Sequence, residues 1–342
     1  MYFERLWYEP PTWRRRAVSI CLAPFALLYA CVIVVRNFAY DRRWLPIVKV
    51  RGALVVSVGN LVVGGAGKTP VTIFLARWAR ACGRRVVVLT RGYGRSSRQI
   101  VRLNSKTLPE VTVSGDEPRL IARRCPGVEV WVGYDRAALA LSAADAGFDF
   151  IVLDDGFQHR RLHRDVDILI HVASQSQWLL PRGPLRDLPH SARRASILWC
   201  WDEVRSHDER VVIAGTRSRS VIDPSGKRHD ASILCHQKVV LLTAIARPAR
   251  VRASVERLGG LVICAFEFRD HYVFSTTELN QAMRCAEEHQ GIVVTTEKDR
   301  ERLPEGCNVW TLQMDVTVAS GLSILASGLG LDPAFLSNDE DS

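Results

Sequence analysis

The sequence has no pair of cysteines in the C-x-x-C spacing, and its nine cysteines are scattered and odd in number. Common zinc sites need such pairs, and a disulfide framework needs an even set at regular spacings, so neither is expected. A free cysteine inside an apolar run behaves as a small hydrophobic residue. A reducing cytoplasm is therefore the simplest compartment for this chain.

Acidic residues are fewer than basic ones: 36 Asp and Glu stand against 46 Lys and Arg, which gives a formal net charge of +10. Most of the basic residues are arginine, whose planar guanidinium suits phosphate oxygens. The excess indicates an acidic partner, whether a nucleotide, a nucleic acid or an anionic lipid surface. The aromatic residues gather near the apolar N-terminal segment and do not interleave a basic stripe, so no nucleic-acid partner is expected.

Charge is absent from the nineteen residues 17–35. A run of this length can cross a bilayer, lie in one leaflet or form a buried core helix. Arginines stand on both sides of the run, so they give no orientation for a spanning helix, and Pro24 weakens a straight span. No A-x-A-like cleavage site follows promptly, so a removed signal peptide is not expected. A segment that dips into one leaflet fits the charges best; a spanning helix and a core helix stay open as alternatives.

The remaining chain of the 342 residues alternates short apolar runs with stretches of helical spacing. This alternation predicts an α/β fold with a mostly parallel sheet and helices on its faces. Turn residues 223–226 between short apolar runs predict a connecting β-hairpin. The expected strands are 53–58, 85–90, 128–132, 150–153, 166–170, 196–200, 238–244, 261–266, 292–295 and 309–312, and the expected helices are 71–81, 117–124, 134–146, 248–258 and 276–289.

The clearest chemical motif is ALVVSVGNLVVGGAGKT at residues 53–69, an apolar strand that feeds a glycine-rich loop ending in Lys-Thr. Backbone N–H groups of such a loop converge on phosphate oxygens, and the next helix adds a favourable partial charge. The usual spacing asks for glycine where Val62 stands, so a tight turn in another α/β protein is the alternative. The residues predicted to bind ATP phosphates are Gly64, Gly65, Ala66, Gly67, Lys68 and Thr69, with the Thr69 hydroxyl also expected on Mg²⁺.

Charged residues follow several of the other strands. The strand 150–153 leads into Asp154 and Asp155, an arrangement that holds Mg²⁺ opposite a phosphate loop, although both could instead cap the next turn. The histidines and arginines of residues 157–167 come next, and a solvated charged loop is the alternative there. Asp116 opens a predicted helix, where it could also serve only as a cap. The proline-flanked Arg186 could present its charge to a developing phosphoryl group.

Together these motifs resemble the tetraacyldisaccharide 4′-kinase family, the lipid A 4′-kinases of Gram-negative bacteria. The resemblance runs from the N-terminal apolar segment to about residue 315. The family's own pattern has its early glycine at the position of Gly59 and not at that of Val62. Two positions depart from it: Asp187 stands where glutamate is frequent, and Tyr272 where a second histidine is common. The matching motifs are Gly59-Asn60, residues 64–69, 91–95, 115–118, Asp135-Arg136, residues 154–159, 183–186, Asp270-His271 and residues 296–299.

The resemblance implies a kinase that uses MgATP to phosphorylate the 4′-hydroxyl of a tetraacylated glucosamine disaccharide 1-phosphate, giving lipid IVA. It implies a membrane-associated segment at 1–45, a P-loop NTPase-type domain at 46–204, a β-hairpin linker at 205–237 and a smaller C-terminal α/β domain at 238–330. The acidic tail 331–342 is expected to be disordered. The expected partners are the acylated disaccharide lipid and the cytoplasmic face of the bacterial inner membrane, and the chain is expected to act as a monomer.

The resemblance also assigns the acceptor side of the site. Asp116 is expected to accept the proton of the sugar hydroxyl, and His271, supplied by the other domain, is expected to pair with it. A histidine beside the carboxylate would orient it and share the proton. Supplying the two residues from separate domains would couple domain closure to catalysis.

On the donor side, Lys68 and Mg²⁺ are expected to neutralise the phosphate charge. The metal would be held by Thr69, Asp154 and Asp155, directly or through water. Arg136 and Arg186 are candidates for contacts to the transferring phosphoryl oxygens. The competing hypothesis is a nucleotide-switched membrane scaffold that hydrolyses ATP without phosphorylating an acceptor; it needs the same loop and anchor but no acceptor-side base.

Overall fold

The computed structural model describes residue 7 and residues 12–172, 177–201 and 208–337. Parts of four predicted segments fall outside these ranges: residues 1–6 and 8–11 of the N-terminal segment, 173–176 and 202–204 of the P-loop domain, 205–207 of the linker and 338–342 of the tail. The chain forms two compact units, the first made of Met1–Arg91, Gly127–Ala214 and Val318–Ser342, the second of Gly92–Pro126 and Gly215–Thr317. Residues 92–126, which the sequence places inside the predicted 46–204 domain, group with the second unit.

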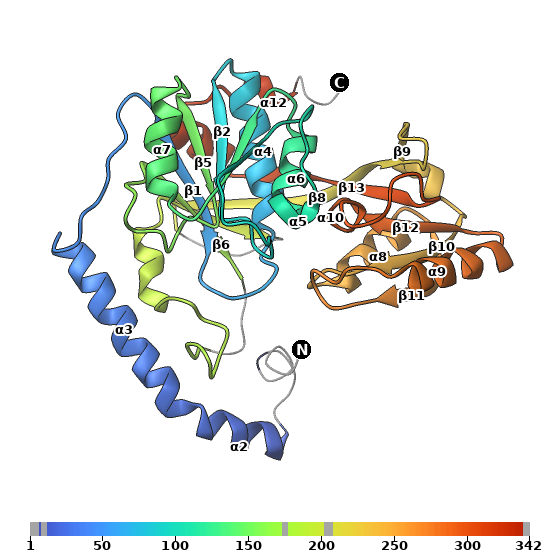
Figure 1. The fold of residues 1–342 in the computed structure, drawn as a ribbon, viewed down its shortest axis with the longest axis horizontal. Helices are drawn as coiled ribbons and strands as arrows, with labels where there is room; N and C mark the ends of the chain where they lie inside the picture. Colours follow the sequence, from blue (N-terminus) through green and yellow to red (C-terminus); the bar gives the residue numbers. More distant parts are fainter. Residues whose placement is uncertain (1–6, 8–11, 173–176, 202–207, 338–342) are drawn as a thin grey trace. The chain divides into compact units, whose positions relative to one another are not determined.

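The first unit contains a parallel sheet centred on β1 (Figure 1). Its strands lie in the order β7 (Ile197–Trp201), β6 (Val166–His171), β1 (Leu54–Asn60), β5 (Phe150–Asp154), β2 (Val86–Thr90) and β4 (Glu129–Val132). Residues 211–214 of β8 (Val211–Ile222) run parallel to β7. Val58 of β1 lies opposite Asp154 of β5, so the loop after β1 and the carboxylates after β5 leave the sheet at the same edge. The prediction of a mostly parallel α/β sheet is confirmed.

Helices α4 (Lys68–Ala81) and α7 (Arg136–Asp145) flank this sheet (Figure 1). The strands are rich in valine because both faces of a helix-covered parallel sheet are buried. The α4 helix packs against β1, β2 and β5 and buries Leu75 and Trp78 completely or nearly so. The α7 helix buries Leu139 and Ala143 against core residues of β1, β2 and β5. This packing fixes the starts of both helices beside the carboxyl edge of the sheet.

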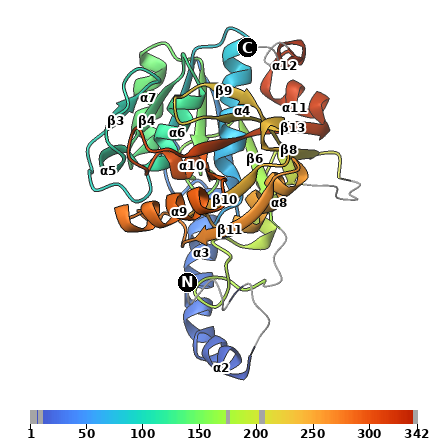
Figure 2. The same cartoon turned by 90° about the vertical axis from the view of Figure 1, so that its right-hand side faces the viewer.

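The uncharged run 17–35 forms parts of two helices, α2 (Trp13–Cys21) and α3 (Ala23–Asp41), with Pro24 in the first turn of α3. Both helices extend away from the sheet of the first unit (Figures 1 and 2). Within the described ranges, α3 is the one helix long and apolar enough to cross a membrane, a test that core helices and signal sequences can also meet. Phe25, Leu28 and Val35 are each more than 60% exposed, so the core-helix alternative does not fit.

In the second unit, strands lie in the order β11 (Leu261–Glu267), β10 (Lys238–Thr243), β12 (Ile292–Thr296), β13 (Trp310–Ser320) and β8. The first four of these strands are parallel. Strand β9 (Arg228–Asp230) pairs with β8 in an antiparallel hairpin around residues 223–227, as the turn residues predict. Helix α8 (Pro248–Arg257) packs on β11, and α9 (Thr276–Glu288) packs on β10 and β12.

Several short elements were not predicted from the sequence. The tail expected to be disordered from residue 331 is ordered as far as Ser337, because Leu331 is buried and Trp78 donates its indole N–H to the Asp332 carbonyl at 2.9 Å. The additional elements are β3 (Val101–Leu103), α5 (Val111–Ser114), η1 (Pro189–Arg194), η2 (Ala231–Leu234), α10 (Glu297–Arg300), α11 (Leu322–Leu329) and α12 (Ala334–Ser337). Helix α6 (Asp116–Arg124) begins one residue before its predicted start.

Candidate active site

The predicted phosphate loop joins the end of β1 at Asn60 to the start of α4 at Lys68. Gly67, the residue before the helix, has φ +80°, a left-handed conformation that glycine adopts without steric cost. A Cβ on Gly67 would lie 2.9 Å from the Trp201 ring. The Trp201 indole N–H donates to the Ala66 carbonyl at 2.8 Å, so the end of β7 holds the loop in place. The free N–H groups of the first turn of α4 favour an anion here.

Lys68 and Arg186 meet at the carboxylate of Asp155. Two guanidinium nitrogens of Arg186 donate to the two Asp155 oxygens, both at 2.8 Å, and the Lys68 ammonium lies 3.6 Å from Oδ1. Burial alone would raise the pKa of Asp155, but the Arg186 hydrogen bonds and the charge of Lys68 hold it well below its usual range. Arg186 and Lys68 also bond the side-chain oxygen of Asn60. The loop lysine, the second carboxylate and the predicted phosphate arginine therefore form one charged cluster.

Asp154, the last residue of β5, points to other partners than Asp155. Its carboxylate is buried and accepts hydrogen bonds from the hydroxyls of Thr72 on α4, at 3.2 Å, and Thr90 at the end of β2, at 3.3 Å. Asp155 turns away because its backbone is left-handed, with φ +54°. Thr69 lies half-buried in the first turn of α4. The three predicted metal ligands thus lie on α4 and at the end of β5, which pack against each other.

These oxygen donors are of the kind that binds Mg²⁺, but they are too few to complete its coordination shell. Mg²⁺ commonly takes one or two carboxylates together with substrate phosphates and waters. In the described ranges no group of three or more His, Cys, Asp or Glu side chains could hold a metal. Asp154, Asp155 and Thr69 would therefore supply only part of its coordination shell, and nucleotide phosphates and water the rest.

Buried donors without acceptors mark the same region. The Asn60 Nδ2, Arg136 Nε and Arg186 Nε atoms are buried and have no hydrogen-bond partner within the described part of the chain. Arg136, at the start of α7, donates through Nη1 to the Asp155 carbonyl at 2.9 Å. Burial lowers the pKa of Arg136. Buried polar groups are nearly always hydrogen-bonded, so unpartnered donors beside a phosphate loop fit an anionic ligand.

The loop after Asp155 is packed rather than solvated. Phe157 is fully buried, and Gln158 donates to the Asn60 carbonyl at 2.8 Å. Burial, together with the charges of Arg136 and Arg164, lowers the pKa of His159 to about 4, so this imidazole is neutral near pH 7. The alternative interpretation of residues 157–167 as a solvated loop is therefore wrong for residues 157–159.

The second unit contains the other predicted pair. His271 Nδ1 lies 2.9 Å from Asp116 Oδ2 although the two residues are 155 positions apart. Asp116 opens α6 after Gly115, whose φ is +93°, and its other oxygen accepts the Glu117 backbone N–H at 2.9 Å. Arg302 Nε lies 3.3 Å from Asp116 Oδ2. Burial alone would raise the pKa of Asp116, but the His271 hydrogen bond and the charges of Lys298 and Arg302 lower it.

His271 is held in an uncommon backbone conformation, with φ +62°. The backbone N–H of His271 donates to the Asp270 carboxylate at 3.1 Å. Such left-handed positions outside glycine cost about 1–3 kcal/mol and concentrate at functional sites. The expectation that Asp116 and His271 come from separate domains differs from the structure: both lie in the second unit, so the pair forms without any movement between units.

Several partners in these clusters received no role from the sequence. Lys298 and Arg302 contact the Asp116–His271 pair, and Trp201 supports the phosphate loop. Lys298 stands in one of the family motifs, but nothing in its local pattern indicates a neighbour almost thirty residues earlier. Trp201 carries no motif at all. Only the fold brings these side chains to the sites.

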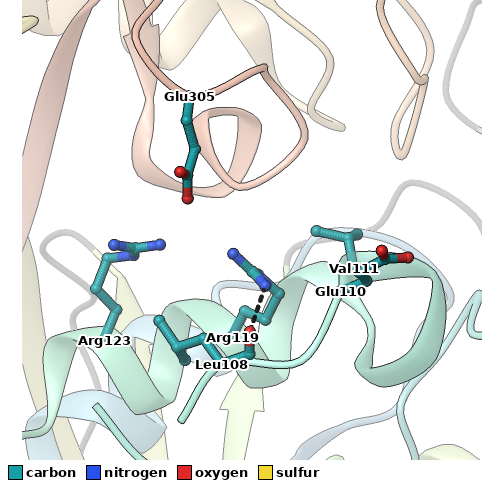
Figure 3. A pocket seen from close by; sticks show the side chains of 6 residues that line it. All are labelled: Leu108, Glu110, Val111, Arg119, Arg123 and Glu305. Carbon is teal, nitrogen blue, oxygen red and sulfur yellow. Dashed lines mark hydrogen bonds between the residues drawn. The ribbon is translucent and has the colours of Figure 1, made fainter. Parts of the chain in front are cut away.

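The second unit contains a cavity of about 420 Å³ whose lining includes none of these residues (Figure 3). Arg119 and Arg123 point into it from α6, and both guanidinium groups pair with Glu301. Because none of the predicted site residues lines it, this cavity is not a candidate for the phosphoryl-transfer site. Its lining residues are Leu108, Glu110, Val111, Arg119, Arg123 and Glu305.

Comparison with known proteins shows the family of this chain. Residues 18–327 match the family described as tetraacyldisaccharide-1-P 4′-kinase. The chain is 37% identical to the tetraacyldisaccharide 4′-kinase of Anaeromyxobacter dehalogenans strain 2CP-C, over 95% of this chain and 94% of that protein. It is 35% identical to the enzyme of that name from Syntrophus aciditrophicus, over 88% of each chain.

A solved structure shares the fold. The crystal structure titled "apo" form LpxK from Aquifex aeolicus in complex with ATP superposes with a TM-score of 0.76 and 29% sequence identity, and the match covers 91% of this chain and 99% of the other. A family match over most of the chain and relatives above 30% identity agree with the motifs and with the fold. The chain belongs to the tetraacyldisaccharide-1-phosphate 4′-kinase family.

Proposed function

We propose that this chain transfers the γ-phosphoryl group of ATP to the 4′-hydroxyl of a tetraacylated glucosamine disaccharide 1-phosphate, giving lipid IVA. Family membership supports the reaction, and the hydrogen bond between Asp116 and His271 is the single observation that carries the mechanism. A scaffold that only hydrolysed ATP would have no need of such an acceptor-side base, and the family match does not favour it.

The residues that act on the acceptor hydroxyl belong to the second unit. The 4′-oxygen attacks the γ-phosphorus while Asp116 accepts its proton, and the bond from the γ-phosphorus to the bridging oxygen breaks with its electron pair leaving on ADP. The lowered pKa of Asp116 keeps the carboxylate ionised and ready to accept a proton at neutral pH. His271, hydrogen-bonded to the same carboxylate, orients it toward the acceptor hydroxyl.

The residues that bind the ATP phosphates belong to the first unit. Backbone N–H groups of residues 64–69 bind the phosphates, and Lys68 neutralises their charge. Arg136 and Arg186, whose Nε atoms are buried without a partner in the described ranges, supply donors to the transferring oxygens. Mg²⁺, held through Thr69, Asp154 and Asp155, would add further charge neutralisation when bound.

The lipid substrate calls for a position at the membrane. The exposed apolar side chains of α3 and the arginines at residues 14–16 suit a helix that lies in one leaflet on the cytoplasmic face of the inner membrane. Replacing Phe25, Leu28 and Val32 together by serine is expected to release the protein from vesicles, as measured by flotation. Unchanged flotation would contradict docking through this face. We also propose that the active form is a monomer, which its mass in detergent micelles would test.

The reaction is tested with γ-labelled ATP and the purified tetraacyl disaccharide 1-phosphate. The proposed function expects label in the lipid, at the 4′-position, in proportion to ADP formed. Label found only in free phosphate would support the scaffold hypothesis and overturn the kinase proposal.

A further inference from the structure

Lys298 is the common partner of three side chains around the Asp116–His271 pair. Its ammonium lies 3.0 Å from Glu117 Oε1, 3.2 Å from Asp270 Oδ1 and 3.2 Å from His271 Nε2. The lysine is the second residue of the short helix α10, and its side chain is only 18% exposed. All of these groups belong to the second unit.

The position of this ammonium determines which nitrogen of His271 carries the proton. A lysine ammonium has three donors and no acceptor, so the Nε2 atom that faces it must accept. In a neutral imidazole the proton then resides on Nδ1, the atom that lies 2.9 Å from Asp116 Oδ2. Nδ1–H therefore donates to the carboxylate. A hydrogen bond to one ring nitrogen commonly fixes the proton on the other in this way.

The charges around the pair are nearly balanced. Lys298 and Arg302 are the positive groups near Asp116, while Glu117 and Asp270 are the negative groups on Lys298. Burial alone would lower the pKa of Lys298, but Glu117, Asp270 and Asp116 raise it well above its usual range, so the lysine stays charged at every working pH. Arg302 is itself paired with the buried Asp299 at 2.8 Å.

We propose that Lys298 is a positioning residue for phosphoryl transfer: its ammonium holds His271 as the Nδ1–H tautomer, so that the ring donates to Asp116 and fixes the carboxylate for the acceptor hydroxyl. This inference rests on the proposed function. Without the ammonium, the ring can place its proton on Nε2, and its bond to Asp116 is lost. Glu117 and Asp270 would also face each other without the cation between them.

A purely structural role makes different predictions. Lys298 connects α10 with α6 and with the segment after β11, so its loss is expected to lower stability in either case. A structural role predicts fewer active molecules, which lowers the measured rate equally at every pH. A positioning role changes the base itself. Because the charge of Lys298 helps to lower the pKa of Asp116, its removal raises that pKa and moves the acid limb of the pH–rate profile to higher pH.

The test compares Lys298→Met, Lys298→Gln and Lys298→Arg in the full-length protein. Lys298→Met is expected to lower kcat by about 10–100-fold, at or below the lower end of the about 10²–10⁴-fold that a positioned base contributes, because Asp116 itself remains, and to leave KM for ATP near wild type. Lys298→Gln keeps a donor for Nε2 without the charge, so we expect a smaller loss of kcat but the same movement of the acid limb. Lys298→Arg keeps the charge and is expected to recover most of the rate. Lys106→Met, at an exposed lysine of the same unit, is the matched control.

An unchanged kcat in Lys298→Met, or a loss with an unmoved acid limb in both neutral variants, would overturn the proposal. If Lys298→Met does not fold, the Gln variant alone decides through its pH profile. Nitrogen NMR of histidine-labelled protein gives a readout without turnover: wild type is expected to show the Nδ1–H tautomer at His271 and Lys298→Met a mixture. Failure of the wild type to phosphorylate the lipid would instead overturn the proposed function, and the NMR result would still judge the tautomer.

Discussion

Trp201→Phe tests whether β7 holds the phosphate loop. The substitution removes the indole N–H that donates to the Ala66 carbonyl at 2.8 Å and keeps an aromatic ring near Gly67. One intramolecular hydrogen bond contributes about 0.5–1.5 kcal/mol net, and the loss acts on the loop that must be ordered to bind phosphate. Since about 1.4 kcal/mol is a factor of ten, we expect the affinity for MgATP to fall about two- to tenfold.

Calorimetric titration of the purified protein with a non-hydrolysable ATP analogue measures this affinity directly. Trp44→Phe, at a tryptophan that is 72% exposed after α3, is the matched control and is expected to bind normally. The thermal unfolding temperature is recorded for both variants, so that a loss of folded protein is separated from a loss of affinity. Wild-type affinity in folded Trp201→Phe would refute the reasoning, because the bond to Ala66 would then have no effect on the loop.

Two further predictions concern the first unit. Asn37→Ala removes a buried hydrogen bond of 2.8 Å to the carboxylate of Asp187, which is expected to lower the free energy of docking α3 by about 1.5–3 kcal/mol. Proteolysis between α3 and the body should therefore become faster, whereas the control Val35→Ala, on the exposed face, should leave it unchanged. Asp155, whose pKa is lowered in the folded state, contributes stability that is present above the unfolded value of about 3.9 and is lost as pH falls through the lower folded value. Urea unfolding of Asp155→Asn should therefore show a weaker fall of stability with acid than wild type; an equal slope below about pH 4 would contradict this.

The local parts of the account were open to prediction from sequence. The glycine-rich loop lies between an apolar run and a helical pattern, so β1, the loop and α4 followed from neighbouring residues alone. Asp154 and Asp155 followed in the same way from the strand before them. Parallel pairing of β1 with β5 then brings the two motifs to one edge of the sheet.

The partners that come from distant parts of the chain were not open to prediction in this way. Asp116 and His271 were expected to pair only because of the family resemblance, since no local pattern joins residues 155 positions apart. The grouping of residues 92–126 with the second unit depends on contacts that the sequence does not encode by spacing. Trp201 and Lys298 each act through one hydrogen-bonding atom whose neighbour only the fold supplies. Residues 331–337 are ordered because Leu331 is buried and Trp78 donates to the Asp332 carbonyl, contacts that their position near the chain end did not indicate.

The central claim is that Asp116 and His271 form the acceptor-side base. Its most direct measurement is single-turnover phosphorylation of the lipid by Asp116→Ala and His271→Ala, each saturated with MgATP, beside Asp145→Asn at an exposed aspartate of α7. The account predicts a loss of about 100-fold or more in both site variants, with ATP affinity near wild type and a normal rate in the control. A wild-type rate in folded Asp116→Ala would contradict the account.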